Sequence, residues 1–348
     1  MWRKKQKALT VTALLLFLLL VVLLSGRNDQ GNTEIYERAD ILMGTSFHGT
    51  VYGGKKDVLP ELAKDLRSLE TERLSWREET SEIAKINCSD GKQPYENISG
   101  ELSGYLTDIL DIADRSGGAL DPTIGNISRL WDFGGANERL PEQEEIDKFL
   151  EKTGYEKLQV SENSIFIPKG VSLDLGAVGK GIGADRAADF IKKQDGIEGA
   201  VIALGGSIAL VGSKPDRSPW NLAIAEPRGE EGEILGLLRL SGEQFVSTSG
   251  DYEKYFEVNQ KRYHHILNPK TGYPAESGLI SVTVVCESGL KSDGLSTACF
   301  VLGLERGMEL LKEYGAEGVL VDEEKNVYIT EGLKSLFDLK DAGYKIVK

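Results

Sequence analysis

The sequence predicts a mixed α+β protein whose folded body follows an apolar N-terminal segment. Three observations predict this class: an uncharged apolar run over residues 8–25, long stretches with apolar residues at helical spacing, and many short alternating stretches after residue 158. The chain has 348 residues, of which 40% are hydrophobic and 28% charged, so it is long enough to bury a sizeable core.

The first element is an expected membrane anchor or signal segment over residues 1–26. Four basic residues precede the apolar run, which at 1.5 Å per residue spans about 27 Å as a helix. The basic flank should stay in the cytoplasm, which places a tether over residues 27–39 and the body over residues 40–348 on the extracytoplasmic face. Leu24-Ser25-Gly26 is a poor cleavage site and no Cys nearby accepts lipid, but a cleaved signal peptide stays open.

Within the body, helical and strand-like stretches alternate without an internal repeat. Leu59, Leu62, Leu66 and Leu69 show the helical spacing, and Pro141 precedes acidic residues as at many helix starts. Helices are expected over residues 57–75, 99–115, 141–152, 180–193 and 292–301. Strands are expected over residues 41–52, 164–168, 200–204, 220–225, 235–240, 253–258, 262–267 and 279–286.

Charge and cysteine content exclude some classes of function. The formal net charge is −14 and no Lys/Arg stripe follows the N-terminus, so nucleic acid is not an expected partner. A phosphorylated ligand would need a local cation or backbone N–H groups to offset the repulsion. The three cysteines are too few for a disulfide framework.

A glycine-rich segment over residues 172–185 runs from a strand-like start into a predicted helix. Such a turn can present backbone N–H groups to a phosphate, and Lys180 adds a positive charge. Neither common phosphate-loop spacing is met, so a simple tight turn remains the alternative.

Residues 291–298 open another apolar helix. Asp293 and Thr297 are four residues apart, which puts both side-chain oxygens on one side of a helix, where they suit Mg²⁺ completed by substrate phosphates. The alternative is that Ser292 and Asp293 only cap the helix.

Two of the three histidines are adjacent, His264 and His265. In a strand they point to opposite faces, so at most one serves a given site. A neutral imidazole could take a proton from an attacking hydroxyl, although each histidine alone is more often structural. Trp131 and Phe133 could pack on a planar ring or simply join the core.

Six short motifs in order give the sequence a family resemblance. They are MGT (43–45), LDPTIG (120–125), DLGAVGKG (174–181), LGG (204–206), HILNPKTGYP (265–274) and SDGLSTA (292–298). This series resembles the ApbE family of FAD:protein FMN transferases, over roughly residues 40–339. The resemblance implies a T-fold-like, ApbE-type body that carries FMN from FAD to a Ser or Thr of an exported acceptor protein, with AMP as the leaving group.

The resemblance also implies roles for single residues. It implies that His265 and Asp293 are catalytic, and that Mg²⁺ binds Asp293, Thr297 and the backbone carbonyl of Ala177. On the cofactor side it implies contacts with FAD, the substrate, from Met43, Asp121, Asp174, Gly176, Lys180, Gly205, Gly206 and Thr271.

Three positions depart from the family pattern: Asn268 replaces an Asp, Gly294 an Ala, and Ser207 follows LGG where Asp or Asn is common. Loss of the carboxylate at Asn268 puts turn geometry in question. Two other functions stay open: an FAD pyrophosphatase that forms FMN and AMP, and a non-catalytic surface flavin-binding protein.

Overall fold

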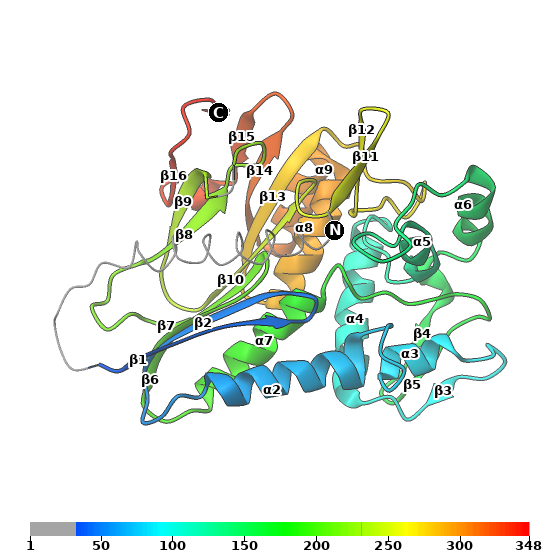
Figure 1. Ribbon diagram of the computed structural model, residues 1–348, viewed down its shortest axis with the longest axis horizontal. Helices are drawn as coiled ribbons and strands as arrows, with labels where there is room; N and C mark the ends of the chain where they lie inside the picture. The colour runs from blue at the N-terminus through cyan, green and yellow to red at the C-terminus, as the bar shows by residue number, and fades with distance from the viewer. Residues whose placement is uncertain (1–32, 231, 348) are drawn as a thin grey trace, which may run out of the picture.

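A nine-stranded sheet forms the centre of the protein (Figure 1). The computed structural model describes residues 33–230 and 232–347. All neighbouring strands are antiparallel except the last pair, which is parallel. In spatial order the strands are β1 (Ile35–Leu42), β2 (Thr45–Gly53), β6 (Ile197–Leu204), β7 (Ser207–Gly212), β10 (Gln244–Gly250), β13 (Leu279–Cys286), β14 (Glu317–Asp322), β15 (Asn326–Ile329) and β17 (Lys345–Ile346).

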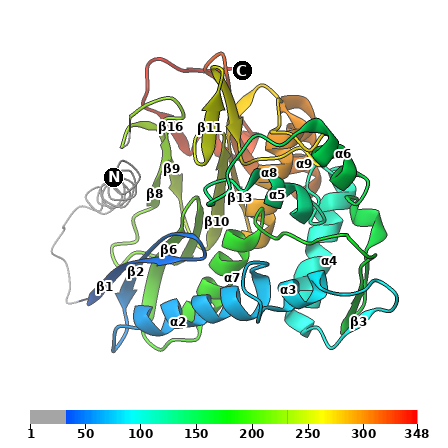
Figure 2. The same cartoon turned by 45° about the vertical axis from the view of Figure 1, so that its right-hand side comes forward.

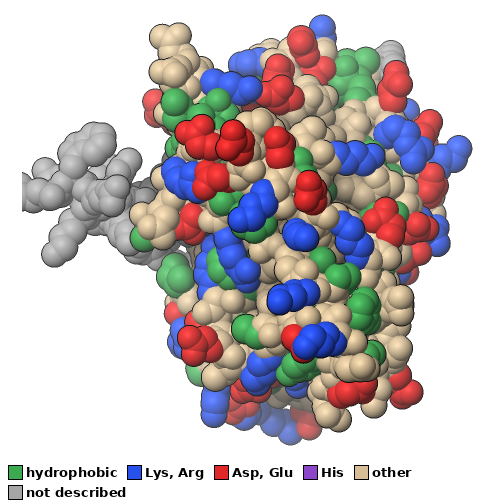
Figure 3. Space-filling view, turned by 90° about the vertical axis from the view of Figure 1, so that its right-hand side faces the viewer, with side chains coloured by type: hydrophobic (Ala, Val, Ile, Leu, Met, Phe, Trp, Pro, Cys, Tyr) green, Lys and Arg blue, Asp and Glu red, His purple; other side chains and the backbone are tan. Residues whose placement is uncertain are grey.

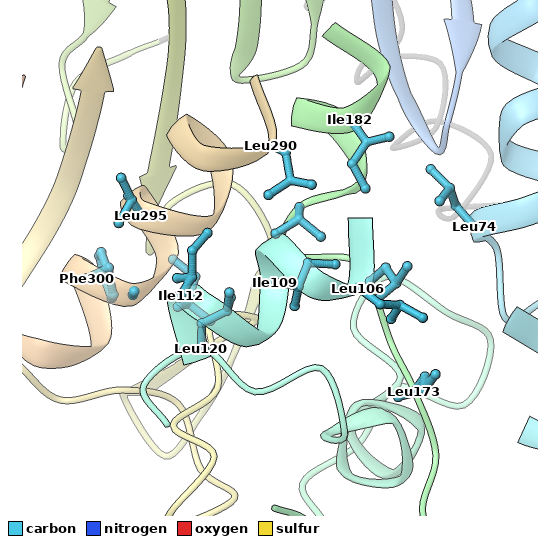
Figure 4. Close-up of a cluster of buried hydrophobic side chains, with 14 of the residues drawn as sticks. Leu74, Leu106, Ile109, Ile112, Leu120, Leu173, Ile182, Leu290, Leu295 and Phe300 are labelled. Carbon is cyan, nitrogen blue, oxygen red and sulfur yellow. The ribbon is translucent and has the colours of Figure 1, made fainter. Parts of the chain in front are cut away.

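Helices cover one face of this sheet, as Figures 1 and 2 show. They are α2 (Leu59–Leu69), α7 (Gly179–Lys192), α8 (Gly289–Leu302) and α9 (Leu304–Tyr314), with α4 (Gly100–Arg115) packed outside α8. Figure 4 shows the aliphatic contact between α4, α7 and α8, which includes Ile109, Ile182 and Leu290. Burying these side chains fixes how α7 and α8 lie against each other.

A second, three-stranded sheet covers the opposite face. It runs β16 (Phe337–Leu339), β9 (Ile234–Leu240) and β8 (Trp220–Ala225). Strand β13 serves both layers, because Val282 and Val284 belong to the helical core while Val285 belongs to the core beneath this small sheet. A register shift between Leu279 and Ser281 interrupts the alternation, and Ile280 joins the same core as Val285.

The remaining elements lie around this sandwich, most of them on the right in Figure 1. They are α3 (Glu82–Asn87), α5 (Gly125–Trp131), α6 (Gln143–Leu150), a small sheet of β3 (Tyr95–Glu96), β5 (Ser164–Phe166) and β4 (Gln159–Val160), and a hairpin of β11 (Tyr255–Val258) and β12 (Lys261–His264). Short helical turns are η1 (Glu70–Leu74), η2 (Tyr155–Lys157) and η3 (Glu331–Leu333).

The predicted mixed α/β class is confirmed, and several element boundaries differ from expectation. The first strand begins at Ile35 rather than near residue 40, because residues 35–42 pair with β2 as an edge strand. Helix α8 begins at Gly289, capped by Ser288, so Ser292 and Asp293 lie inside the helix and do not cap it.

The expected N-terminal anchor, residues 1–26, and most of the tether lie outside the described residues. Among the residues that are described, no helix is long and apolar enough to cross a membrane.

Candidate functional site

The candidate site centres on the contact between the first turn of α7 and the interior of α8. Two glycines allow this close approach, since a Cβ on Gly181 would lie 2.1 Å from the carbonyl oxygen of Gly289. Asp293 is 1% exposed, and its Oδ2 accepts a hydrogen bond of 2.8 Å from the backbone N–H of Gly181. The carboxylate therefore lies at the positive end of α7, not of its own helix.

Lys180 supplies the nearest positive charge to this carboxylate. Its Nζ lies 3.7 Å from Oδ1 of Asp293. Burial raises the pKa of Asp293, and Lys180 opposes that rise, while Asp293 in turn raises the pKa of Lys180. A buried carboxylate in this setting is stabilised by any cation brought close to it.

Thr297 and Ala177 are the other two expected cation ligands, and each lies close in sequence to α7 or α8. Thr297 follows one turn later on α8, and its Oγ1 lies 3.2 Å from Oγ of Ser249. Ala177 belongs to the turn that leads into α7. The described residues contain no group of three or more His, Cys, Asp or Glu side chains able to hold a metal. A carboxylate, a hydroxyl and a carbonyl fit Mg²⁺, which takes its remaining ligands from water and substrate phosphates.

His265 has the geometry of a proton acceptor. It is half-buried, and its Nδ1 lies 3.3 Å from the backbone carbonyl oxygen of Lys254. A carbonyl only accepts, so Nδ1 carries the proton and Nε2 keeps a free lone pair. Desolvation, followed by the charges of Lys180 and Lys254, lowers the pKa of His265 to about 3, which keeps the ring neutral.

The observed strand β12 ends at His264, so His265 lies just beyond it and not inside the strand expected over residues 262–267. His264 points into the core. It is 7% exposed, its Nε2 lies 3.0 Å from the carbonyl oxygen of Ala275, and its ring meets Phe300 edge-on at 5.5 Å. These contacts make His264 a core residue.

Asn268 preserves the turn that follows His265. Its Oδ1 accepts a hydrogen bond of 2.9 Å from the N–H of Lys270, and its carbonyl accepts from Gly272. An Asp would accept the same side-chain bond, so the departure at this position leaves the turn geometry intact. Thr271 is exposed in this turn and its Oγ1 accepts from Tyr273.

Two hairpin turns bring glycines and Met43 towards α7. Met43 and Gly44 both have positive φ, 52° and 67°, and the sulfur of Met43 lies against Gly183 of α7. Gly205 has φ 54° in the turn between β6 and β7, and Gly206 accepts from the N–H of Thr248. A side chain at either glycine of this second turn would meet neighbouring oxygens.

Asp174 and Asp121 hold neighbouring loops. Asp174 accepts a hydrogen bond of 2.8 Å from Gly176 N–H at the start of the glycine-rich turn, and its own N–H donates to Pro122. Asp121 is buried, and its carboxylate accepts from the N–H and hydroxyl of Thr123 and from the N–H of Tyr155. The structure thus gives Asp121 a turn-forming role, and contact of either aspartate with FAD stays a prediction.

Trp131 belongs to the core. It is 0% exposed, its Nε1 donates to the carbonyl of Gly272, and it stacks on Phe133 at 5.4 Å. Of the two alternatives for Trp131, packing in the core fits this burial and packing on a flavin ring does not.

Two residues of the site, together with Trp76, escaped the sequence analysis. Glu253 and Lys254 connect β10 to β11 and act on the pKa values of Lys180 and His265. Trp76 follows η1, and the guanidinium groups of Arg77 and Arg129 lie over its ring at 4.0 and 4.5 Å. A single Glu, Lys or Trp outside a motif gives no signal that could have found them.

Positive charge gathers locally although the chain is acidic. Figure 3 shows the right-hand face of Figure 1, where Lys and Arg side chains collect in the middle. Among the described residues, a cavity of about 270 Å³ on this side is lined by Asn126, Arg129, Leu130, Asn137, Arg139 and Phe149. A larger cavity of about 550 Å³ lies elsewhere, between β9, β10 and β13, and none of the sequence-predicted site residues lines it.

Comparison with known proteins shows similarity over most of the chain. A sequence model of the ApbE family matches residues 43–320. The FAD:protein FMN transferase of Escherichia coli (strain K12) is 30% identical over 308 residues, which cover 86% of this chain and 87% of the relative. Two crystal structures are similar. The ApbE protein of Thermotoga maritima has a TM-score of 0.79 and 32% identity, over 87% of this chain and 99% of that one. The apo flavinyl transferase ApbE of Pseudomonas stutzeri has a TM-score of 0.78 and 29% identity, over 90% of this chain and 100% of that one.

Proposed function

This chain belongs to the ApbE family and is an FAD:protein FMN transferase, and on that premise we propose that it joins FMN to a Ser or Thr hydroxyl of an acceptor protein, with Mg²⁺ bound and AMP released. The observation that carries the proposal is the buried carboxylate of Asp293, held at the N-terminus of α7 beside Lys180. One carboxylate with neighbouring hard oxygens suits a cation that also binds a pyrophosphate.

The cation would be held by Asp293, Thr297 and the carbonyl of Ala177. When bound, Mg²⁺ would neutralise charge on the pyrophosphate of FAD. Lys180 adds a second positive charge at the same place, and the dipole of α7 favours an anion near its N-terminus.

His265 would act on the acceptor hydroxyl. The hydroxyl oxygen attacks the FMN phosphorus, the bond from that phosphorus to the bridging oxygen of the pyrophosphate breaks, and AMP leaves with the bonding electrons. The hydroxyl proton passes to Nε2 of His265, which is unprotonated because Nδ1 faces the carbonyl of Lys254. The product is a phosphoester between FMN and the acceptor.

We also propose that the enzyme works on the extracytoplasmic face of the membrane, on exported acceptors. The basic residues before an apolar run over residues 8–25 support this orientation. Protease treatment of intact cells that carry a C-terminally tagged chain tests it, because a tag that resists digestion until the cells are opened contradicts the proposal.

The test of the chemistry separates transfer from hydrolysis. Purified protein is incubated with FAD and Mg²⁺, with and without an FMN-binding acceptor domain, and AMP and acceptor mass are measured. We expect AMP and an FMN-phosphoester mass increment in equal amounts only when the acceptor is present. Rapid AMP release without acceptor would identify a pyrophosphatase instead.

A further inference from the structure

The segment Asp251–Lys254 connects two parts of the fold that meet at the site. It leaves the central strand β10 after Gly250 and enters the hairpin β11–β12 at Tyr255. The N–H of Asp251 donates to the carbonyl of Ile280 on β13, which ties the start of the segment to the central sheet. The position of this segment therefore decides where the hairpin begins.

Lys254 at its end controls the orientation of His265. Its carbonyl oxygen accepts a 3.0 Å hydrogen bond from the backbone N–H of His265 and lies 3.3 Å from Nδ1 of the ring. One carbonyl thus holds both the backbone and the tautomer of the proposed proton acceptor. A shift of this carbonyl would release the ring.

The carboxylate of Glu253 lies close to the turn between β6 and β7. A Cβ built on Gly206 in that turn would lie 3.2 Å from Oε1 of Glu253. The charge of Glu253 also interacts with those of Lys180 and Asp293. The same segment therefore faces the proposed base on one side and the lysine beside the cation site on the other.

Arg228 holds this segment from outside the site. Its two terminal nitrogens donate to the two carboxylate oxygens of Asp251 at 2.6 and 2.7 Å, a fork-to-fork pair. The side chain of Asp251 is 11% exposed and that of Arg228 is 32% exposed. Arg262 also approaches Asp251, but at 3.9 Å, beyond hydrogen-bond distance.

Arg228 is itself anchored to the second sheet. Its backbone N–H donates to the carboxylate of Glu226, a buried residue at the end of β8, and the hydroxyl of Tyr344 donates to the same carboxylate. A rigid chain of contacts thus runs from β8 and the C-terminal region to Asp251.

We propose that Arg228 is a positioning residue of the active site, whose two-pronged ion pair with Asp251 places the carbonyl of Lys254 so that His265 keeps its proton on Nδ1. Arg228 touches neither the proposed cation ligands nor the imidazole, and it acts through the segment Asp251–Lys254. The inference rests on the proposed function of His265.

The test compares Arg228→Met and Arg228→Lys with a matched control. Arg239→Met is the control, because Arg239 lies on β9, which the turn that contains Arg228 joins to β8, and pairs with Asp338 at 2.8 Å. For each variant, ¹⁵N NMR of the imidazole gives the tautomer of His265, FMN transfer gives kcat and KM for FAD, and thermal unfolding gives the folded fraction.

We expect Arg228→Met to lower kcat at least about tenfold with little change in KM for FAD, because a misplaced proton acceptor affects the chemical step and not ground-state binding. Its His265 signals should show a mixture of tautomers. Arg228→Lys, which keeps the charge but not the fork, should recover part of kcat, and Arg239→Met should match the wild type.

A folded Arg228→Met protein with the wild-type tautomer and a kcat equal to that of Arg239→Met would overturn the proposal. If Arg228→Met does not fold, Arg228→Lys decides in the same way. Wild-type protein that transfers no FMN would refute the proposed function instead, and the NMR comparison would still show whether Arg228 governs the tautomer.

Discussion

The ring of His265 faces the backbone carbonyl of Lys254, with Nδ1 3.3 Å from the oxygen. Because the carbonyl cannot donate, this contact selects the tautomer whose Nε2 is free to accept a proton. His264, its neighbour in sequence, is turned into the core and bound to Ala275.

This difference predicts opposite effects for the two histidines. His265→Ala should lower kcat for FMN transfer by about 10² to 10⁴, the usual range for loss of a general base, with little change in melting temperature. His264→Ala should mainly lower the melting temperature, since it removes a buried ring that packs on Phe300. Steady-state kinetics and thermal unfolding of both proteins check this, and equal kinetic losses in the two variants would contradict it.

The histidines should also titrate below their ordinary value of 6.5. Burial lowers the pKa of His48, His264 and His265, the last to about 3. In the unfolded chain these rings take up protons near pH 6.5 and in the folded protein they do not, so their contribution destabilises the fold as pH falls from about 6.5 towards 3.

NMR titration of the three imidazole Cε1–H signals measures this directly. We expect none of them to show a midpoint near pH 6.5, and we expect His265→Asn to lose less stability than wild type between pH 7 and pH 5. A His265 midpoint near 6.5 would show that its surroundings do not keep the ring neutral in the free enzyme.

Gly181 and Gly179 provide a matched pair on α7. Gly181→Ala should destabilise the protein by about 1–3 kcal/mol, because its Cβ would lie 2.6 Å from Cβ of Asp293 and collide with Gly289. Gly179→Ala meets nothing within 4 Å and should raise stability slightly, by less than about 1 kcal/mol. Urea unfolding of both variants gives the comparison, and a neutral Gly181→Ala would mean that α7 and α8 are not so close.

Position 268 should accept Asp, the residue of the family motif, without loss of stability. Asn268→Asp keeps an acceptor for the N–H of Lys270 and should change stability by less than about 0.5 kcal/mol. Asn268→Ala loses that bond and should cost about 1 kcal/mol. Both values come from chemical denaturation. If the two variants are equally destabilised, the side-chain bond is not what holds the turn.

The sequence predicted the fold class and the family's reaction better than the boundaries of the helices and strands. Helical spacing identified α2 and α4, and Pro141 with the acidic residues after it identified α6, whereas α3 and α5 are too short for periodicity to reveal them. Different surroundings for His264 and His265 were expected from strand geometry, although His265 lies just beyond the end of β12. Asp293 was identified by its four-residue spacing from Thr297, but its real partner, the N–H of Gly181, lies 112 residues away and depends on two glycines meeting across helices.

The same reason explains why Glu253, Arg228 and Trp76 carried no signal. Each acquires its role only through long-range contacts, such as the pairing of Arg228 with Asp251. Conversely, Asp121 was nominated as a cofactor ligand from a loop motif, and the structure occupies its carboxylate with three bonds inside that loop and to Tyr155.

Removal of the carboxylate at the centre of the site gives a further prediction. Asp293→Asn keeps the shape of the side chain but not its charge, and should lower FMN transfer at least about 100-fold, since a metal supplies several kcal/mol of charge stabilisation. Binding of Mn²⁺ by electron paramagnetic resonance, in the presence of FAD, should weaken in parallel. Loss of turnover with unchanged Mn²⁺ binding would place the metal elsewhere.

Crystals of the protein soaked with FAD and Mn²⁺ test the central claim most directly. The anomalous signal of Mn²⁺ locates the ion without assumptions about the flavin. We predict one ion bonded to a carboxylate oxygen of Asp293, to Oγ1 of Thr297, to the carbonyl of Ala177 and to the pyrophosphate, at about 2.0–2.3 Å. An ion and pyrophosphate bound away from Asp293, with Lys180 still beside that carboxylate, would contradict the account.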